Sequence, residues 1–120
     1  MDFDAAVAAH LAAVTGRDLD AYLATVHDEV TVVLPNGKLL SGRDEVGAFH
    51  RDWFADPDWR MDTTPVSTAV TGDTAVTVLA VAYHDVDAAG AAYRKDYLLS
   101  LVFARRDGRW LLVHDQNTFC

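Results

Sequence analysis

Cysteine is nearly absent from the sequence, and basic residues are few. A single thiol, Cys120, in a chain of 120 residues excludes an internal disulfide and any metal site built from several cysteines. This usage is typical of a reduced protein, so we expect a cytoplasmic location. Lys and Arg number 10 against 18 Asp and Glu, which gives a net charge of −8. Nucleic acid phosphates and anionic lipid surfaces repel such a chain, so we expect neither as a partner.

Several signatures of targeting and chemistry are also missing. No apolar run is long enough to span a membrane, and the acidic start Met1-Asp2-Phe3-Asp4 is unlike a signal peptide. The sequence has no glycine-rich phosphate loop and no Gly-x-Ser-x-Gly motif. The five histidines, at positions 10, 27, 50, 84 and 114, lack the short spacings of a metal site. We therefore expect neither a metal nor a cofactor.

The residues that are present indicate one globular domain over 1–120. Hydrophobic residues make up 51% of the chain and charged residues 23%, which is ordinary for a globular protein. A chain of this size buries roughly two-thirds of the surface that it exposes when unfolded. That is enough for one core and one small cavity, and too little for two lobes.

The first half of the chain has a mainly helical pattern. Apolar residues at three- and four-residue spacing predict a helix over 3–15, and a second, shorter helix follows at 18–26. The β-branched run 30–34 predicts a strand, which a Pro-Asn-Gly turn ends. Ser41, as an N-cap, starts a third helix that Pro57 forbids from continuing.

The second half changes to the alternating period of β-strands. The four expected strands are 59–71, 74–86, 93–106 and 109–118. Asp107-Gly108, between the last two, is a strong signal for a two-residue hairpin turn. The predicted fold class is therefore α+β, with three N-terminal helices packed on a strongly curved, mainly antiparallel sheet.

The last hairpin can be read in register from its turn. With Asp107-Gly108 at the turn, the pairs on the bulkier face are Phe103 with Leu112, Leu101 with His114, and Leu99 with Gln116. We assign this face to the interior because its side chains supply core volume. His114 and Gln116 then need partners, water or a cavity, since unpaired buried polar groups are costly. Asp115 falls on the outer face in this register.

The outer face of the same hairpin is also apolar. Leu98, Val102, Leu111 and Val113 form a stripe along it. A face in contact with water is normally polar, so this stripe needs cover. A second copy of the chain is the simplest cover, and we expect a homodimer through the outer sheet face.

Four segments carry a resemblance to a known family. They are GRD at 42–44, which opens a helix, FHRDWF at 49–54, DPDW at 56–59 and RRDGRWLLVHDQNT at 105–118. Together they resemble the SnoaL-like, polyketide-cyclase-like branch of the nuclear-transport-factor-two-like superfamily, over essentially the whole chain. The closing stretch is the most specific part of the likeness.

The resemblance implies a cone-shaped α+β barrel whose sheet curls around a deep pocket, in chains that often dimerise through their sheets. The superfamily includes ketosteroid isomerase, scytalone dehydratase, limonene epoxide hydrolase and polyketide cyclases, together with non-catalytic binding and assembly domains. Its catalytic members mostly place an Asp or His base in an apolar cavity, where a tyrosine or a protonated acid stabilises the oxyanion.

His114 and Tyr97 are the candidate catalytic residues. His114 fits a pocket base or hydrogen-bond donor, and it also fits a core histidine that fixes its strand against the third helix. Tyr97 lies at the same end of the hairpin as Gln116. It offers a phenol proton, or it is an aromatic residue at the rim of the pocket. The candidate ligand-binding residues are Phe49, His50, Trp53, Tyr83, Leu101, Phe103 and Gln116.

The sequence does not decide which face of the strand at 74–86 points inward. Either Leu79, Val81, Tyr83 and Asp85 point inward, or the alternate set that ends at His84 does. The first set is larger, so we favour it, and it places a Tyr–Asp pair near the mouth of the pocket.

Two kinds of function follow. The first is a pocket for a small hydrophobic molecule of polyketide or terpenoid type, in a cofactor-independent cyclase, isomerase or hydrolase or in an accessory protein of secondary metabolism. The alternative is a non-catalytic ligand-binding domain or a dimeric assembly domain. A titratable pair inside an open cavity would distinguish the enzyme from both.

Overall fold

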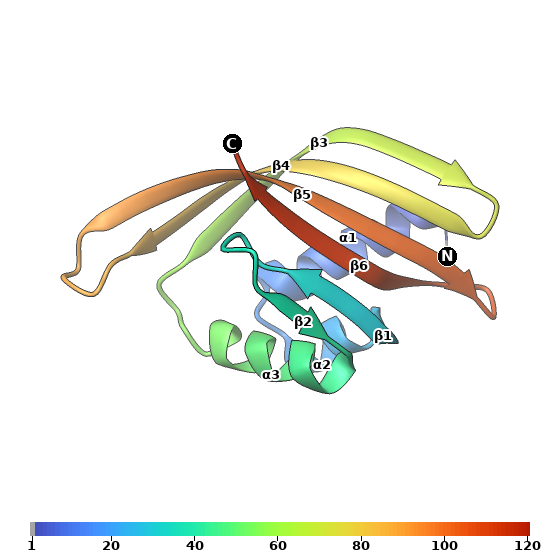
Figure 1. Cartoon of the computed structure of the whole chain (residues 1–120), viewed down its shortest axis with the longest axis horizontal. Coiled ribbons are helices and arrows are strands. Elements are labelled where there is room, and N and C mark those ends of the chain that lie inside the picture. The colour runs from blue at the N-terminus through green and yellow to red at the C-terminus, as the bar shows by residue number, and fades with distance from the viewer. Residues whose placement is uncertain (1) are drawn as a thin grey trace.

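The computed structural model describes residues 2–120, which form three helices on one side of a six-stranded sheet (Figure 1). The elements are α1 (Phe3–Thr15), α2 (Leu19–Leu23), β1 (Val26–Val33), β2 (Leu39–Ser41), α3 (Arg43–Phe54), β3 (Arg60–Thr71), β4 (Thr74–Val86), β5 (Ala92–Arg106) and β6 (Arg109–Phe119). The strand order is β2-β1-β6-β5-β4-β3, and only β1 and β6 pair in parallel. The predicted α+β class is confirmed, although the sheet curls without closing into a barrel.

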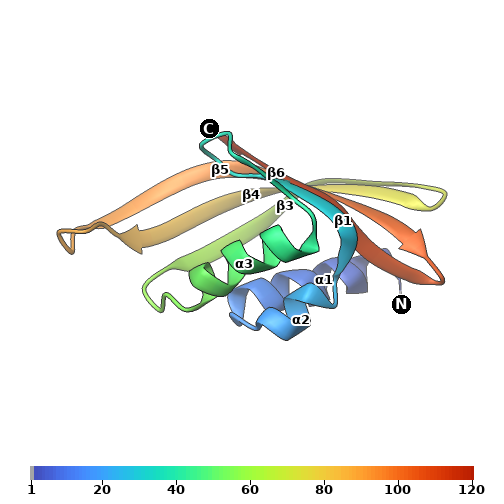
Figure 2. The same cartoon turned by 60° about the horizontal axis from the view of Figure 1, so that its bottom comes forward.

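All three helices lie against the same face of the sheet (Figure 2). Helix α1 begins where Asp2 accepts a hydrogen bond from the Ala5 amide at 2.8 Å, as an N-cap residue does. None of the helices in residues 2–120 has the length and apolar character needed to cross a membrane. The opposite face of the sheet has no helix over it within the described part of the chain.

The start of α3 differs from the prediction. Ser41 is not the N-cap, because it belongs to the short strand β2 and pairs with Thr31. Gly42 takes the N-cap position at φ +87°, a conformation that glycine adopts with little strain, and no side chain caps the helix. The run Leu39-Leu40-Ser41 is too short and too weakly β-branched to be recognised as a strand.

The core lies between the helices and the inner sheet face. Tyr22, Leu79, Leu101, Phe103 and Leu112 are fully or almost fully buried there. The ring of Phe103 meets the ring of Phe3 edge-on, with 5.4 Å between centroids, so α1 is fixed to the centre of the sheet.

A β-bulge in β6 overturns the register expected for the last hairpin. The turn at Asp107-Gly108 forms as predicted, and Phe103 lies opposite Leu112. Val113 is then an extra residue, so His114 pairs with Val102 and Asp115 pairs with Leu101. One inserted residue moves every later side chain to the other face. The inward orientation predicted for His114 and Gln116 is therefore wrong, and Asp115 points inward instead.

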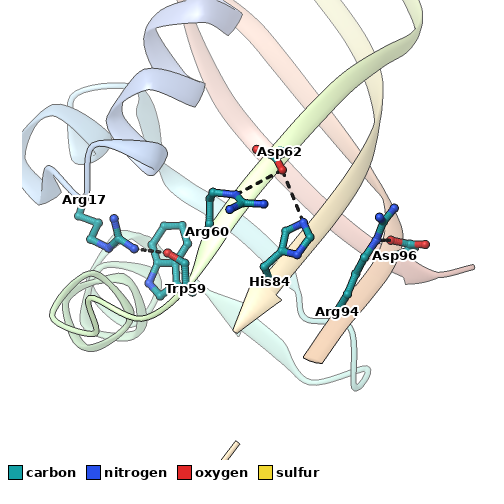
Figure 3. Close-up of polar contacts among 7 residues, drawn as sticks. All are labelled: Arg17, Trp59, Arg60, Asp62, His84, Arg94 and Asp96. Carbon is teal, nitrogen blue, oxygen red and sulfur yellow. Dashed lines mark hydrogen bonds and ion pairs between the residues drawn. The ribbon is translucent and has the colours of Figure 1, made fainter. Parts of the chain in front are cut away.

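Strand β4 has the favoured orientation. Leu79 and Val81 are buried, which confirms the choice of the larger set as the inner one. On the outer face, His84 Nε2 lies 3.5 Å from the Asp62 carboxylate, which also contacts Arg60 (Figure 3). These exposed charges add little to stability.

Candidate functional site

A cavity of about 380 Å³ lies between the helices and the inner face of the sheet. This volume is within the usual range of small-molecule sites. Its helical side is formed by His10, Leu11 and Val14 of α1, Tyr22 of α2, and Phe49, His50 and Trp53 of α3. Its sheet side includes Val32, Met61, Tyr83, Tyr97, Leu99, Asp115 and Asn117. Apolar and aromatic groups dominate, and the polar groups are few.

Five of the predicted site residues line this cavity. They are Phe49, His50, Trp53, Tyr83 and Tyr97, which α3, β4 and β5 bring together. The other predicted residues, although described by the structure, are not in its wall. Leu101 and Phe103 are fully buried core residues, Phe103 against Phe3 and His10 of α1, and Gln116 is exposed on the outer face.

His114 has a structural position on the outer face. Its Nδ1 lies 2.7 Å from the Thr31 hydroxyl, and its Nε2 lies 3.3 Å from the Gln116 side-chain oxygen. The first contact joins β6 to the parallel strand β1. The prediction that His114 faces the pocket is wrong because of the bulge at Val113.

Asp115 is the acid that sequence reasoning placed outside. Its side chain is buried in the cavity wall, with 8% of the residue exposed. Asn117 Nδ2 donates to its Oδ1 at 2.9 Å and to the Val33 carbonyl at 2.9 Å, which fixes the carboxylate against β1. Burial raises the pKa of the Asp115 carboxyl from 3.8 to about 7, and the bond from Asn117 opposes that rise.

A signal for this arrangement exists in the sequence. Asp115, Asn117 and Phe119 alternate and share one face of β6, and each of them lines the cavity. If the strand is counted outward from the turn with regular pairing, these three side chains are assigned to the outer face of the sheet. Read backward from Phe119, a bulky aromatic residue at the strand end, the same alternation places Asp115 inside.

Two buried histidines line the helical side of the cavity. Burial, with the proximity of His50, lowers the pKa of His10 to about 3. Burial also lowers the pKa of His50 to about 4, against the effect of its bond to the Val46 carbonyl. Both imidazoles are therefore neutral at physiological pH, and they act as hydrogen-bonding groups and not as cations.

Tyr22 and Tyr97 are the two buried residues among the four tyrosines that line the cavity with Asp115. Tyr97 donates to Met61 Sδ at 3.6 Å. The Tyr22 hydroxyl is buried and has no hydrogen-bond partner among residues 2–120. Burial, with a contribution from Asp115, raises the pKa of both phenols above the ordinary value, so both keep their protons.

An aromatic stack forms the wall behind Trp53. Its ring stacks on Trp59 with 4.2 Å between centroids. The Arg17 guanidinium lies over the Trp59 ring, 4.1 Å from its centroid, and donates to the Trp59 carbonyl (Figure 3). Trp53 Nε1 donates to the Tyr83 hydroxyl at 3.2 Å, and that hydroxyl donates to Asp85 at 2.9 Å. The expected Tyr–Asp pair is present, and Trp53 is the member of the stack that lines the cavity.

The comparisons agree with this architecture. The SnoaL-like domain family matches residues 4–119. A ketosteroid isomerase-like protein from Erwinia carotovora atroseptica has a TM-score of 0.83 and 21% identity, covering 97% of this chain and 92% of that one. A candidate dehydratase of the NTF2-like family from Streptomyces avermitilis has a TM-score of 0.80 and 20% identity, covering 98% and 93%.

An assembly domain has the same fold. The association domain of CaMKII from C. elegans has a TM-score of 0.76 and 22% identity, and the match covers 98% of this chain and 92% of that one. No curated protein matches the chain. At these identities the likeness to solved structures establishes the fold alone, so function has to be argued from the cavity.

Proposed function

We propose that this chain, which belongs to the SnoaL-like domain family, is a cofactor-independent acid–base enzyme for a small hydrophobic molecule. The observation that carries the proposal is the Asp115 carboxyl, buried in the wall of an apolar cavity with a pKa of about 7. Such a group takes up and releases a proton near neutral pH, as a general base must.

The arrangement supports proton transfer next to a carbonyl group. The Asp115 carboxylate accepts the proton from the carbon beside the carbonyl. The C–H electron pair then forms the C=C bond of an enolate, and the negative charge moves to oxygen. Tyr22 lines the same cavity, and its protonated hydroxyl, which has no partner among residues 2–120, supports stabilisation of that charge by hydrogen bonding. Where a second C=C bond is conjugated with the enolate, the charge extends to the far carbon of that bond, and returning the proton there completes an isomerisation without an oxidant or a cofactor.

Hydrogen exchange on a simple ketone tests this proposal. 2-Tetralone fits an apolar cavity and has acidic protons beside its carbonyl, whose replacement by deuterium in D2O is followed by NMR. We expect the protein to accelerate this exchange and Asp115→Asn to lose the acceleration by at least about 100-fold. The matched control is Asp62→Asn, which removes an exposed carboxylate on the outer face. Equal rates for Asp115→Asn and the unaltered protein would contradict the assignment of the base.

A second candidate function is a dimeric assembly or binding domain. The apolar outer face of the sheet favours it, and so does the association domain among the structural neighbours. We infer a homodimer in which the two chains meet through this face. In the single chain, Leu98 and Val76 of this face are each more than a third exposed. The dimer is compatible with catalysis, because the cavity is lined by the helices and the inner face of the sheet. A cytoplasmic location, without nucleic acid or membrane partners, stays a prediction.

A further inference from the structure

The hydrogen bonds of His10 and His50 fix which ring nitrogen holds the proton. Thr25 Oγ1 donates its only proton to the Tyr22 carbonyl at 2.6 Å, so it must accept from His10 Nδ1, which lies 2.8 Å away. His50 Nδ1 lies 2.7 Å from the Val46 carbonyl, which can only accept. Both histidines therefore hold their proton on Nδ1, and Nε2 of each is a bare acceptor.

The rings of both histidines lie beside the ring of Tyr22, whose hydroxyl is unmatched in the described chain. The Tyr22 ring stacks on His50 with 4.1 Å between centroids and lies 5.3 Å from His10. Neither Nε2 atom has a hydrogen-bond partner in the described chain, and the Tyr22 hydroxyl has none either. All three residues are almost fully buried and line the cavity. Buried polar groups in native proteins are normally paired, so this cluster lacks partners that a ligand can supply.

The cluster restricts the chemistry of that partner. A ketone or an ether oxygen accepts from Tyr22 but leaves the imidazole lone pairs unmatched. An ammonium group donates to the imidazoles, but it has no lone pair and cannot accept from the Tyr22 hydroxyl. A hydroxyl group both donates and accepts, and it is neutral.

We propose that the buried end of the ligand is a phenolic or enolic hydroxyl, which accepts from Tyr22 and donates to Nε2 of His10 or His50. This inference rests on the proposed ligand-binding function of the cavity. It also fits the proposed chemistry, because an enol is the protonated form of the enolate that Asp115 would generate. The aromatic side chains of Trp53 and Phe49 in the cavity wall suit an aromatic ring that bears such a group.

Calorimetric titration with three related probes tests the proposal. 2-Naphthol has the hydroxyl, 2-methoxynaphthalene has an oxygen that cannot donate, and naphthalene has neither. We expect 2-naphthol to bind roughly tenfold more tightly than 2-methoxynaphthalene, from the hydrogen bonds that the methyl group prevents. Equal affinities would overturn the proposal while leaving the apolar cavity in place. If none of the three binds, the ligand-binding function fails as well.

Variants then assign the preference to the cluster. Tyr22→Phe should reduce the 2-naphthol preference to near unity, whereas His84→Phe, on the outer face of the sheet, should keep it. His10→Phe or His50→Phe should lower the preference too, which provides a second readout. If the preference survives in Tyr22→Phe and in both histidine variants, the proposal is wrong.

The unfolding temperature of Tyr22→Phe, measured without ligand, tests whether the Tyr22 hydroxyl is unpaired in the free protein. The change removes a hydroxyl with no partner in residues 2–120, so the variant should be as stable as the unaltered chain or more stable. A marked fall in unfolding temperature would mean that the hydroxyl is paired inside the free protein. That result would remove the unmatched donor on which the proposal depends.

Discussion

The carboxyl of Asp115 is the group in the cavity wall whose pKa lies near neutral pH. Asn117 donates a hydrogen bond to it, and two neutral histidines lie in the helical wall of the same cavity, in α1 and α3. No Lys or Arg lies within the salt-bridge distance of this carboxylate in residues 2–120, so burial dominates and the protonated form is favoured. The folded chain therefore holds a proton at this site more tightly than the unfolded chain does.

Asp115→Asn should change how stability depends on pH. Because the pKa of this carboxyl is raised on folding, its contribution is fully present below pH 4 and is lost as pH rises through about 7. The amide cannot ionise, so the unfolding temperature of Asp115→Asn relative to that of the unaltered chain should increase from pH 5 to pH 8. The difference between the two curves is the measurement, because His10 and His50, whose pKa values are lowered, destabilise both proteins equally below pH 6.5. A constant difference over this range would show that the carboxyl titrates normally.

Asn117 positions the carboxylate and limits the rise of its pKa. Replacing Asn117 with Leu removes the donor to Oδ1, so the pKa of Asp115 should rise further, by about one unit. The pH profile of ketone exchange, or the carboxyl carbon resonance in an NMR titration, measures it. Asn36→Leu, in an exposed turn, is the control. An unchanged pKa in Asn117→Leu would mean that the observed bond does not hold the charged form.

At the scale of elements, the strands could be predicted but one bulge could not. Helix α1 and strands β3 to β6 agree with the periodicity of the sequence within two residues at each end. The turn at Asp107-Gly108 is local chemistry, since both residues adopt positive φ. Val113 has no such signature, because any β-branched residue fits a strand as well as a bulge. The fold survives this error, whereas the candidate site changes from His114 to Asp115.

His114→Ala separates the two registers experimentally. In the observed register its side chain bonds to Thr31 between β6 and β1, away from the cavity. We expect 2-naphthol affinity and ketone exchange to stay unchanged, while stability falls by about 1 kcal/mol from the lost hydrogen bond. Thr31→Val should cause a similar loss, because it removes the other partner. Loss of binding in His114→Ala at unchanged stability would restore the regular register and place the histidine in the pocket.

At the scale of the whole molecule, the helices cover only one face of the sheet (Figure 2). The uncovered face combines Leu98, Val102 and Leu111 with small residues of β4, and no helix within residues 2–120 covers it. Such an apolar, uncovered sheet face is unusual in a monomeric protein. Sequence patterning indicated the stripe because both faces of the hairpin are apolar, although the bulge moves Val113 out of its regular row.

Adding positive charge to the uncovered face tests the dimer. Leu98→Lys combined with Val102→Lys introduces two ammonium groups on one side of β5, and in a face-to-face dimer they would be buried without partners. We expect dimers of the unaltered chain in light scattering and monomers or aggregates of this variant. Val66→Lys combined with Val70→Lys adds the same charge to exposed positions of the edge strand β3, which are 59% and 53% exposed, and should leave the mass unchanged. If the β5 variant stays dimeric and equally stable, the contact lies elsewhere on the molecule.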